Sequence, residues 1–444
     1  MDAGNCRRIT DNLGMLGRLR RLAVDISPLR ESRDYRLVWS GQLISLVGRQ
    51  VTVVAVPFQV FQLTHSSIAV GVIGIFQVVP YVFLSLVGGS IADRVDRRRL
   101  LLATQLLLAA SSAVLMLAAF FGFASLGLLY VMVGVVAAIS AVNLPGQSAM
   151  TPNLVRPEHL ASAMALNFAE FQTSIIVGPA IAGLVLARVG FGVAYAIDVA
   201  TFGAALMALF LIPPQPPKDR REETPLQSII QGFGFVGRQK AVLGGFVVDL
   251  NAMIFGMPRA LFPVLAVSTF HAGPAGLGLL YAASGVGAVV GSVLSGFVAR
   301  IRHQGRAVII GAAGWGVGIT LFGLLTMSLW LGLVLLAIAG AFDTVSAIAR
   351  STILQTVTPD RFRGRANAAN SMVVVGGPML GDLRAGAMGG LLSPGFSLVF
   401  GGAVCVAACA VIARVFPALT DYDSTAPAPE VTALARDSTE HEPI

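Results

Sequence analysis

The feature that most constrains this chain is a series of long apolar stretches between about residues 36 and 416. A helix that crosses the hydrocarbon core of a bilayer needs about 20 mostly apolar residues at 1.5 Å rise per residue. Only 12% of the residues are charged, against roughly 25% in soluble domains. The sequence therefore predicts an all-α membrane protein with twelve transmembrane helices, near residues 36–63, 69–91, 99–122, 126–150, 160–187, 192–213, 241–268, 275–299, 307–328, 330–350, 366–392 and 395–416.

Basic residues cluster in every second connection between these segments. Connections rich in Arg and Lys stay on the cytoplasmic side of a membrane. We therefore expect both termini to be cytoplasmic. The basic residues of the even-numbered connections are Arg94, Arg97, Arg98, Arg99, Arg156, Lys218, Arg220, Arg221, Arg238, Lys240, Arg300, Arg302, Arg306, Arg361, Arg363 and Arg365, whereas Arg188 is the main exception among the odd-numbered ones.

The chain divides at a proline-rich stretch, Pro213 to Pro217, that a charged run follows. Such a composition is typical of a linker. We predict a cytoplasmic N-terminal segment (1–35), a six-helix bundle (36–213), a cytoplasmic linker (214–240), a second six-helix bundle (241–416) and a disordered cytoplasmic tail (417–444).

Two amphipathic patterns lie outside the spans. Leucines spaced helically from Leu13 to Leu22, with Ile26, stand beside arginines and predict an interfacial helix on anionic lipid, although a disordered basic tail is an alternative. Between Pro225 and Arg238, apolar residues at helical spacing predict a short surface helix.

The two halves repeat one another at a shift of about 200 residues. The fifth predicted span contains GPAIAG (178–183), and the eleventh contains GPMLGD (377–382). Each follows a short polar turn, Arg156–Glu158 in one half and Thr358–Asp360 in the other. The repeat predicts two pseudo-symmetric six-helix bundles that face each other across a central cavity.

After the second span the chain reads GGSIADRVDRRRLL (88–101), which resembles the cytoplasmic signature motif of the major facilitator superfamily. The resemblance implies a gating motif in which Asp93 meets the N-terminus of the eleventh span, where an anion is favoured. It also implies that Arg94, Arg97 and Arg98 take part in that contact, while Gly89 allows close helix approach. The alternative is that the basic cluster only sets orientation.

The Gly178, Pro179 and Gly183 pattern resembles the antiporter motif of exporters in this superfamily, with Ala182 in place of one glycine. Together with DYRLVW at Asp34 and GGPMLGDLRAG in the eleventh span, the chain resembles the branch of siderophore and drug exporters that includes bacterial enterobactin exporters. The resemblance implies a secondary active transporter in a bacterial inner membrane that exports a small molecule by proton antiport and alternating access. An importer of the same fold is the main alternative, and an uncoupled channel or scramblase is another.

Charged residues inside the predicted spans must face protein or a wet cavity, because each costs about 2.5–3.5 kcal/mol at a lipid-facing centre. They are Arg49, Glu170, Asp198, Asp249, Arg259, Asp343, Asp382 and Arg384. The resemblance implies that spans 1, 4, 7 and 10 line the cavity, which nominates Arg49, Asn143, Gln147, Asp249, Asn251, Arg259 and Asp343 for a proton or substrate site.

Three acids are candidates to carry the proton, because burial disfavours the charged form of a carboxyl. They are Glu170, Asp249 and Asp343, and the sequence does not rank them. For each charge the alternative is a structural ion pair between helices. Asp382 and Arg384 lie two residues apart and cannot pair along one helix face, so we assign them a structural or gating role with partners on other segments.

Other classes of protein lack support in the sequence. There is no Gly-Lys-Ser or Gly-Lys-Thr for a P-loop ATPase and no HExxH or GxSxG for an enzyme. We expect no enzyme activity, no cofactor and no metal site. The net charge of +8 lies in short clusters rather than on one face, so no nucleic-acid partner is expected. The expected partners are the lipid bilayer, a small-molecule substrate and protons, for a protein that works as a monomer.

The orientation can be tested by cysteine labelling in intact cells. Single cysteines at Ser66, Ser125, Gly273 and Ser328 lie in odd-numbered connections and should react with an impermeant maleimide. Lys218→Cys should react only after the membrane is made permeable. Labelling of Lys218→Cys in intact cells would reverse the orientation.

Overall fold

The computed structural model describes residues 25–216, 225–293 and 301–423, with the side chains of 86–94, 225–229, 360 and 361 outside the description. The spans of the N-terminal half are α3 (Arg33–Thr64), α4 (Ser67–Arg94), α5 (Arg97–Phe121), α6 (Leu126–Leu154), α7 (Leu160–Arg188) and α8 (Gly190–Leu211). Those of the C-terminal half are α10 (Lys240–Gly256) with its continuation to Thr269, α12 (Gly273–Val293), α14 (Gln304–Leu324), α15 (Leu329–Val357), α16 (Asp360–Leu391) and α17 (Pro394–Val415). The short elements are α2 (Ser27–Glu31), η1 (Pro157–His159), α9 (Pro225–Arg238) and α18 (Pro417–Thr420).

The predicted number of spans agrees with the structure. Within the described residues, 11 helices are long and apolar enough to cross a membrane. The twelfth, α16, has 32 residues and is the least apolar of the long helices, with Asp382 and Arg384 in its second half. It packs against α4, α10 and α17, so protein rather than lipid covers much of its surface.

Local sequence explains where several helices begin. The Ser32 hydroxyl accepts a hydrogen bond from the Tyr35 backbone N–H at the start of α3, and Asp96 does the same for Arg99 at the start of α5. Ser125 and Ser393 cap α6 and α17 in the same way. Each cap satisfies one of the free N–H groups of a first turn.

The seventh span differs from the single helix expected over residues 241–268. The α-helix α10 ends at Gly256, and the chain continues through η2 (Arg259–Leu261), α11 (Phe262–Val264) and the π-turn η3 (Leu265–Thr269). Pro258 causes the break, because proline lacks an N–H donor and disfavours helical geometry in the residue before it. The tenth span also differs, since α15 runs seven residues past the predicted end and finishes at Val357.

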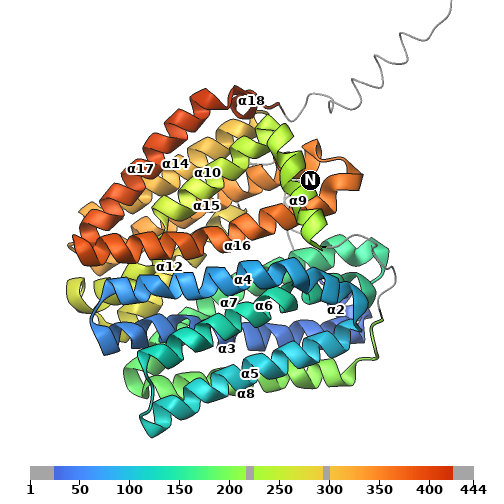
Figure 1. Cartoon of the computed structure of the whole chain (residues 1–444), viewed down its shortest axis with the longest axis horizontal. Coiled ribbons are helices and arrows are strands. Elements are labelled where there is room, and N and C mark those ends of the chain that lie inside the picture. Colours follow the sequence, from blue (N-terminus) through green and yellow to red (C-terminus); the bar gives the residue numbers. More distant parts are fainter. Residues whose placement is uncertain (1–24, 217–224, 294–300, 424–444) are drawn as a thin grey trace, which may run out of the picture.

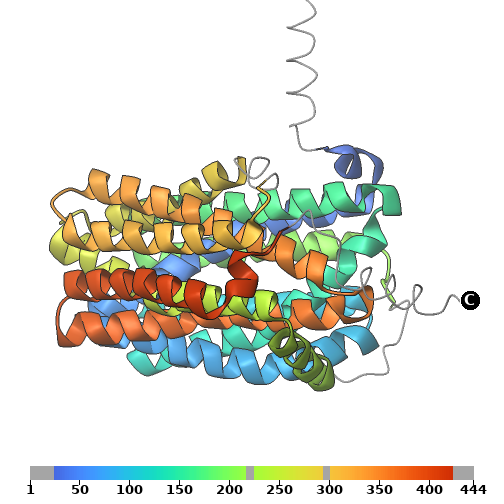
Figure 2. The same cartoon turned by 90° about the horizontal axis from the view of Figure 1, so that it is seen from above.

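The helices form two bundles that lie side by side (Figure 1). The bundles meet where α4 packs against α16 and where α7 packs against α12. Seen from above, the helices of both halves run roughly parallel to one common axis (Figure 2). The fold is therefore the pair of six-helix bundles that the internal repeat predicts.

A short helix precedes the first span of each half and packs on the fifth span of the same half. In the N-terminal half α2 contacts α7, and in the C-terminal half α9 contacts α16. The α9 helix is the amphipathic helix expected between Pro225 and Arg238, with Val236 buried and Ile230 and Phe233 exposed. The other amphipathic pattern, from Leu13 to Leu22, lies outside the described residues.

The two halves approach most closely at the end of the molecule opposite the arginine-rich connections. A Cβ on Gly71 of α4 would lie 2.9 Å from the Cα of Gly386 of α16. On the other side, a Cβ on Gly183 of α7 would lie 3.0 Å from the Cα of Gly278 of α12. Only glycine permits helix backbones to come this near, as in small-residue packing motifs of membrane proteins.

This packing predicts that Gly386→Ala lowers thermal stability. The added methyl group meets backbone that cannot rotate away, and overpacking typically costs about 1–3 kcal/mol. The matched control is Gly203→Ala in α8, where an added Cβ would meet nothing within 4 Å. Melting temperatures of the purified variants test this, and equal melting of the two alanine variants would mean that the halves do not hold this contact.

Candidate functional site

The N-terminal half buries two carboxylates around one arginine. Arg49 of α3 interacts electrostatically with Glu170 of α7 and Asp198 of α8. Asp198 is 1% exposed, and its Oδ2 accepts hydrogen bonds from the hydroxyls of Thr52 at 2.6 Å and Ser112 at 2.8 Å. Asp198 Oδ1 and Glu170 Oε1 are buried and, among the described residues, have no hydrogen-bond partner.

Two cavities meet at Arg49. The inner cavity, of about 290 Å³, is bounded by α3, α4, α5, α6 and α8 and includes Arg49, Tyr81 and Asp198 in its lining. The linker-end cavity, of about 260 Å³, is lined by α3, α5, α6 and α7 and includes Trp39 and Glu170. Arg49 and Leu144 line both. The arginine thus stands between one cavity with Asp198 and another with Glu170.

The remaining nominees of this half serve mainly as helix contacts. Asn143 is 2% exposed and donates to the Thr104 hydroxyl of α5 at 2.9 Å. Gln147 lines the linker-end cavity and donates to Gln42 Oε1 of α3 at 3.1 Å. The structure therefore brings Gln147 to a cavity together with Arg49 and uses Asn143 in packing.

In the C-terminal half the acids have arginine partners. Asp249 Oδ1 of α10 pairs with Arg350 Nη1 of α15 at 2.6 Å. Asp343 interacts with Arg350 and Arg259 as well as with Asp249. The sequence analysis missed Arg350, because the predicted tenth span ended at that residue. Its position seven residues after Asp343, on the same helix face, is the signal that would have identified it.

Asn251, nominated for the cavity, is a packing residue. Its side-chain amide donates to the backbone carbonyl of Cys405 in α17 at 3.0 Å and lies 3.6 Å from the Cys409 sulfur. Both cysteines are buried, as expected for small apolar side chains in this position. This cluster joins α10 to α17.

Arg384 and Asp382 support the break in the seventh span. Arg384 donates to the backbone carbonyls of Ile254 and Phe255 at the end of α10, and to that of Ser397 in α17. Asp382 Oδ1 accepts from the Ala260 N–H at 3.1 Å and interacts with Arg259. These bonds satisfy backbone groups that a helix break leaves free in a membrane. The partners lie on other segments, as proposed from the sequence.

The charges of the two halves are therefore balanced differently. In the C-terminal half three aspartates are matched by three arginines, with Asp249 and Asp343 near Arg350, and Asp343 and Asp382 near Arg259, while Arg384 lies near Asp382. In the N-terminal half two carboxylates share Arg49. The N-terminal half thus has one carboxylate more than it has arginines at this point.

The basic residues of the signature motif contact their own half. Arg97 Nη1 donates to the Ala149 carbonyl of α6 at 2.9 Å. Arg98 donates to the carbonyls of Leu209 and Phe210 in the last turn of α8. Both arginines were expected to contact the eleventh span, and the structure places them on α6 and α8 instead. The physical reason is that free carbonyls near a helix end attract cations. The side chains of Gly89, Asp93 and Arg94 lie outside the described residues.

The glycine and proline pattern of α7 packs on two neighbours. A Cβ on Gly178 would lie 2.8 Å from the Val47 carbonyl of α3, while Gly183 faces α12. The Pro179 carbonyl is also in contact range of Gly278. The pattern thus brings α7 close both to the helix that carries Arg49 and to the opposite half.

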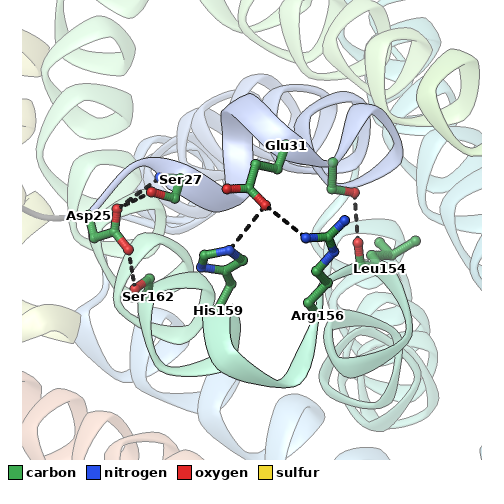
Figure 3. A network of polar contacts seen from close by, with 8 residues as sticks. Asp25, Ser27, Glu31, Leu154, Arg156, His159 and Ser162 are labelled. Atoms are coloured by element: carbon green, nitrogen blue, oxygen red, sulfur yellow. Dashed lines mark hydrogen bonds and ion pairs between the residues drawn. The ribbon is translucent and has the colours of Figure 1, made fainter.

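A polar network fixes α2 to the turn between α6 and α7 (Figure 3). Glu31 accepts from His159 at 3.1 Å and pairs with Arg156 at 3.7 Å. The Ser27 hydroxyl and backbone N–H and the Ser162 hydroxyl donate to Asp25 and lower the pKa of its carboxyl to about 2. Asp25 is therefore ionised at neutral pH. The network holds the start of α3, and with it Arg49, against α7.

The buried pair between Asp249 and Arg350 predicts a clear stability result. Asp249→Leu alone removes the carboxylate that pairs with Arg350 at 2.6 Å, and breaking a buried pair from one side typically costs about 3–5 kcal/mol. The double variant Asp249→Leu, Arg350→Met replaces both charges by apolar groups and should recover most of that loss. Thermal unfolding of both variants tests this. If Asp249→Leu abolishes transport with unchanged melting, Asp249 acts in transport rather than in structure.

Comparisons with known proteins agree with this architecture. The family model described as "Transmembrane secretion effector" matches residues 23–438. Enterobactin exporter EntS of Citrobacter koseri is 30% identical over 393 residues, which cover 85% of this chain and 92% of the relative. Enterobactin exporter EntS of Shigella boydii serotype 18 is 30% identical over 377 residues, covering 84% and 89%.

Solved structures share the fold. A bacterial homologue of the human lysosomal transporter Spinster, in an inward-facing and unoccupied conformation, aligns with TM-score 0.65 and 15% identity over 87% of this chain and 95% of its own. A D-xylose–proton symporter aligns with TM-score 0.68 and 15% identity, covering 87% and 98%. These relatives are transporters rather than enzymes. The chain is therefore a multi-pass membrane protein that belongs to the transmembrane secretion effector family of the major facilitator superfamily.

Proposed function

We propose that this protein is a secondary active exporter that moves a small molecule out of a bacterial cytoplasm in exchange for protons. The observation that carries the proposal is the pair of acids, Glu170 and Asp198, that share Arg49 between two cavities. A carrier needs a group that binds and releases its coupling ion. Acids with unpaired oxygens beside a cavity meet that need.

Export is the favoured direction because the curated relatives at 30% identity are enterobactin exporters. Enterobactin, or a molecule of similar chemistry, is accordingly the first substrate to test. The orientation expected from the arginine-rich connections, with both termini in the cytoplasm, makes the linker-end cavity the cytoplasmic one. A substrate would then reach Arg49 from the cytoplasm past Trp39 and Gln147.

Alternating access is supported by the contacts between the halves. The glycine pairs Gly71–Gly386 and Gly183–Gly278 close the end opposite the linker. The linker-end cavity lies at the other end, between the first turns of α3, α5 and α7 and the last turns of α6. We infer that the transport cycle separates the glycine pairs and brings the linker ends together.

Proton entry supplies enough free energy for this work. One charge that crosses the membrane gains about 2.3 kcal/mol per 100 mV. A tenfold gradient of a neutral substrate costs about 1.4 kcal/mol. One proton per cycle therefore sustains a gradient of roughly 40-fold per 100 mV.

The two acids of the N-terminal half can be tested in a transport assay. In everted vesicles with an imposed proton gradient, Glu170→Gln and Asp198→Asn should each abolish enterobactin accumulation, because the exchangeable proton site is lost. Both should retain downhill exchange of preloaded substrate. Thr173→Ala, at an exposed position of α7 that lines neither cavity, is the matched control and should keep gradient-driven accumulation.

Three outcomes would overturn the proposal. Accumulation by both acid variants at the wild-type level would make these carboxylates structural and remove the coupling assignment. Accumulation in right-side-out cells rather than in everted vesicles would identify an importer. Movement only down a gradient in wild-type protein would identify a channel or scramblase.

A further inference from the structure

The helix α9, which precedes the first span of the C-terminal half, has two apolar faces. On its inner face Gly232 and Val236 are buried and Phe235 is half-buried. On its outer face Ile230 is 60% exposed and Phe233 is 40% exposed. A surface helix that only has to pack on protein needs one apolar face. The outer face therefore needs an explanation of its own.

The inner face accounts for the packing of α9 on α16. A Cβ on Gly232 would strike the Arg365 carbonyl, so the two helices approach closely there. The Phe235 ring stacks on the Phe362 ring with their centroids 5.2 Å apart. The Arg365 guanidinium lies 5.3 Å from the centroid of the same Phe362 ring. The helix also contacts α4 and α10, and its outer face stays on the molecular surface.

The direction of α9 is that of a helix lying along the membrane surface. The spans run roughly parallel to the axis along which they cross the bilayer, whereas α9 runs steeply across them, over α16 (Figure 1). It lies at the outer edge of the molecule, beside α16 and α4 (Figure 2). Gln239 alone separates it from α10, so it lies at the level where that span begins. Helices in such a position occupy the boundary between lipid headgroups and acyl chains.

The composition of the outer face fits that boundary. Ile230, Phe233, Gly234 and Gly237 follow the spacing i, i+3, i+4 and i+7, which places them on one side of the helix. All four are exposed, and none is polar or charged. A Cβ on Gly234 or Gly237 would meet nothing within 4 Å. Acyl chains would cover the two large side chains and remove their apolar surface from water.

The charges around α9 determine which lipid would be favoured. Residues 225–240 include no Asp or Glu, and Arg238 and Lys240 are both exposed. On α16, Asp360 is the one acid among residues 360–381, whereas Arg363 is exposed at the same end of the helix. Basic side chains at a membrane surface attract anionic headgroups, and each raises the affinity up to about fivefold.

The corresponding helix of the N-terminal half has a different surface. There the exposed carboxylates of Asp25 and Glu31 anchor α2 to the turn between α6 and α7 (Figure 3). Acidic groups at that position would repel anionic headgroups. A helix at this place in the repeat therefore does not need an apolar outer face flanked only by basic residues. That face is a property of α9.

We propose that the outer face of α9 is a binding site for anionic lipid on the linker side of the membrane. Ile230 and Phe233 enter the acyl-chain region, while Arg238 and Lys240 hold the lipid phosphate groups. Because α9 also contacts α4 and α16, the bound lipid lies beside the place where the two halves meet. The site depends neither on the identity of the substrate nor on the direction of transport.

Fluorescence quenching by brominated lipid tests the contact. Phe233→Trp is reconstituted as the full chain in bilayers of phosphatidylcholine and phosphatidylglycerol, with bromine on the acyl chains of one lipid at a time. The emission of the added tryptophan is the difference from the parent protein. Quenching by brominated phosphatidylglycerol should exceed, severalfold, the value that its mole fraction predicts. The matched control is Val334→Trp on the exposed face of α15, where quenching should follow mole fraction for both lipids.

Two results of this experiment reject the site. Quenching of Phe233→Trp in proportion to mole fraction for both lipids would mean contact with lipid but no selection by charge. Quenching by aqueous acrylamide, with no effect of either brominated lipid, would place the outer face in water.

Charge variants in the Phe233→Trp background test the selection. Gly234→Asp adds a carboxylate where a side chain meets no protein, and it should lower the phosphatidylglycerol excess by up to about fivefold. Gly234→Asn has nearly the same size without the charge and should leave the excess unchanged. Arg238→Gln should also lower the excess, whereas Arg414→Gln, at the exposed end of α17, should not. If Gly234→Asp does not fold, Arg238→Gln decides alone. Equal excess in Gly234→Asp and Gly234→Asn, or in Arg238→Gln and Arg414→Gln, overturns the proposal.

Discussion

The structure depends on how charges are held inside helices that face lipid. An unpaired charge in the hydrocarbon region costs several kcal/mol, so each one must lie against protein or a wet cavity. In the C-terminal half this requirement is met by equal numbers of aspartates and arginines, with Asp249 paired to Arg350 at 2.6 Å and Asp382 bonded at the break of the seventh span. These contacts tie α10 to α15 and α16, so the positions of those helices follow from the pairing. In the N-terminal half the same requirement is met incompletely, since Glu170 and Asp198 share one arginine.

Sequence was sufficient for the features that depend on local composition. The spans follow from hydropathy, because a helix is the simplest way to satisfy backbone groups in lipid. The two-bundle arrangement follows from the repeat of GPAIAG and GPMLGD. Even so, α16 crosses with the least apolar composition of the long helices, because α4, α10 and α17 cover it. The break at Pro258 was missed for a related reason. Prolines also lie inside α3, α4 and α6, and those helices do not end there. At Pro258 the break is stabilised by hydrogen bonds from Arg384 and to Asp382, which the sequence does not reveal.

The site could be anticipated only in part, because pairing between helices is tertiary information. Arg49 and Glu170 were recognised as costly charges, but nothing local indicates that Asp198, 28 residues further along the chain than Glu170, shares the same arginine. Arg350 was missed since the end of a span is uncertain by several residues, and α15 extends to Val357. Arg97 and Arg98 belong to a motif whose resemblance to the superfamily signature implies a contact between the halves. Their guanidinium groups instead bond to backbone carbonyls of helices in their own bundle. A motif identifies residue types and leaves the partners open.

The internal repeat makes the difference between the halves informative. Two bundles with one ancestral topology would be expected to bury similar charges. The C-terminal bundle matches its acids with arginines, whereas the N-terminal bundle has one carboxylate in excess beside two cavities. Matched pairs hold helices in one arrangement, because separating them exposes both charges to lipid. An acid without an arginine of its own can be neutralised by a proton or bonded by a ligand instead. We therefore expect the N-terminal bundle to respond to binding and the C-terminal bundle to move as the more rigid partner. Met379 of α16 both lines the inner cavity and meets Gly74 of α4, so the contact between the halves lies directly beside that cavity.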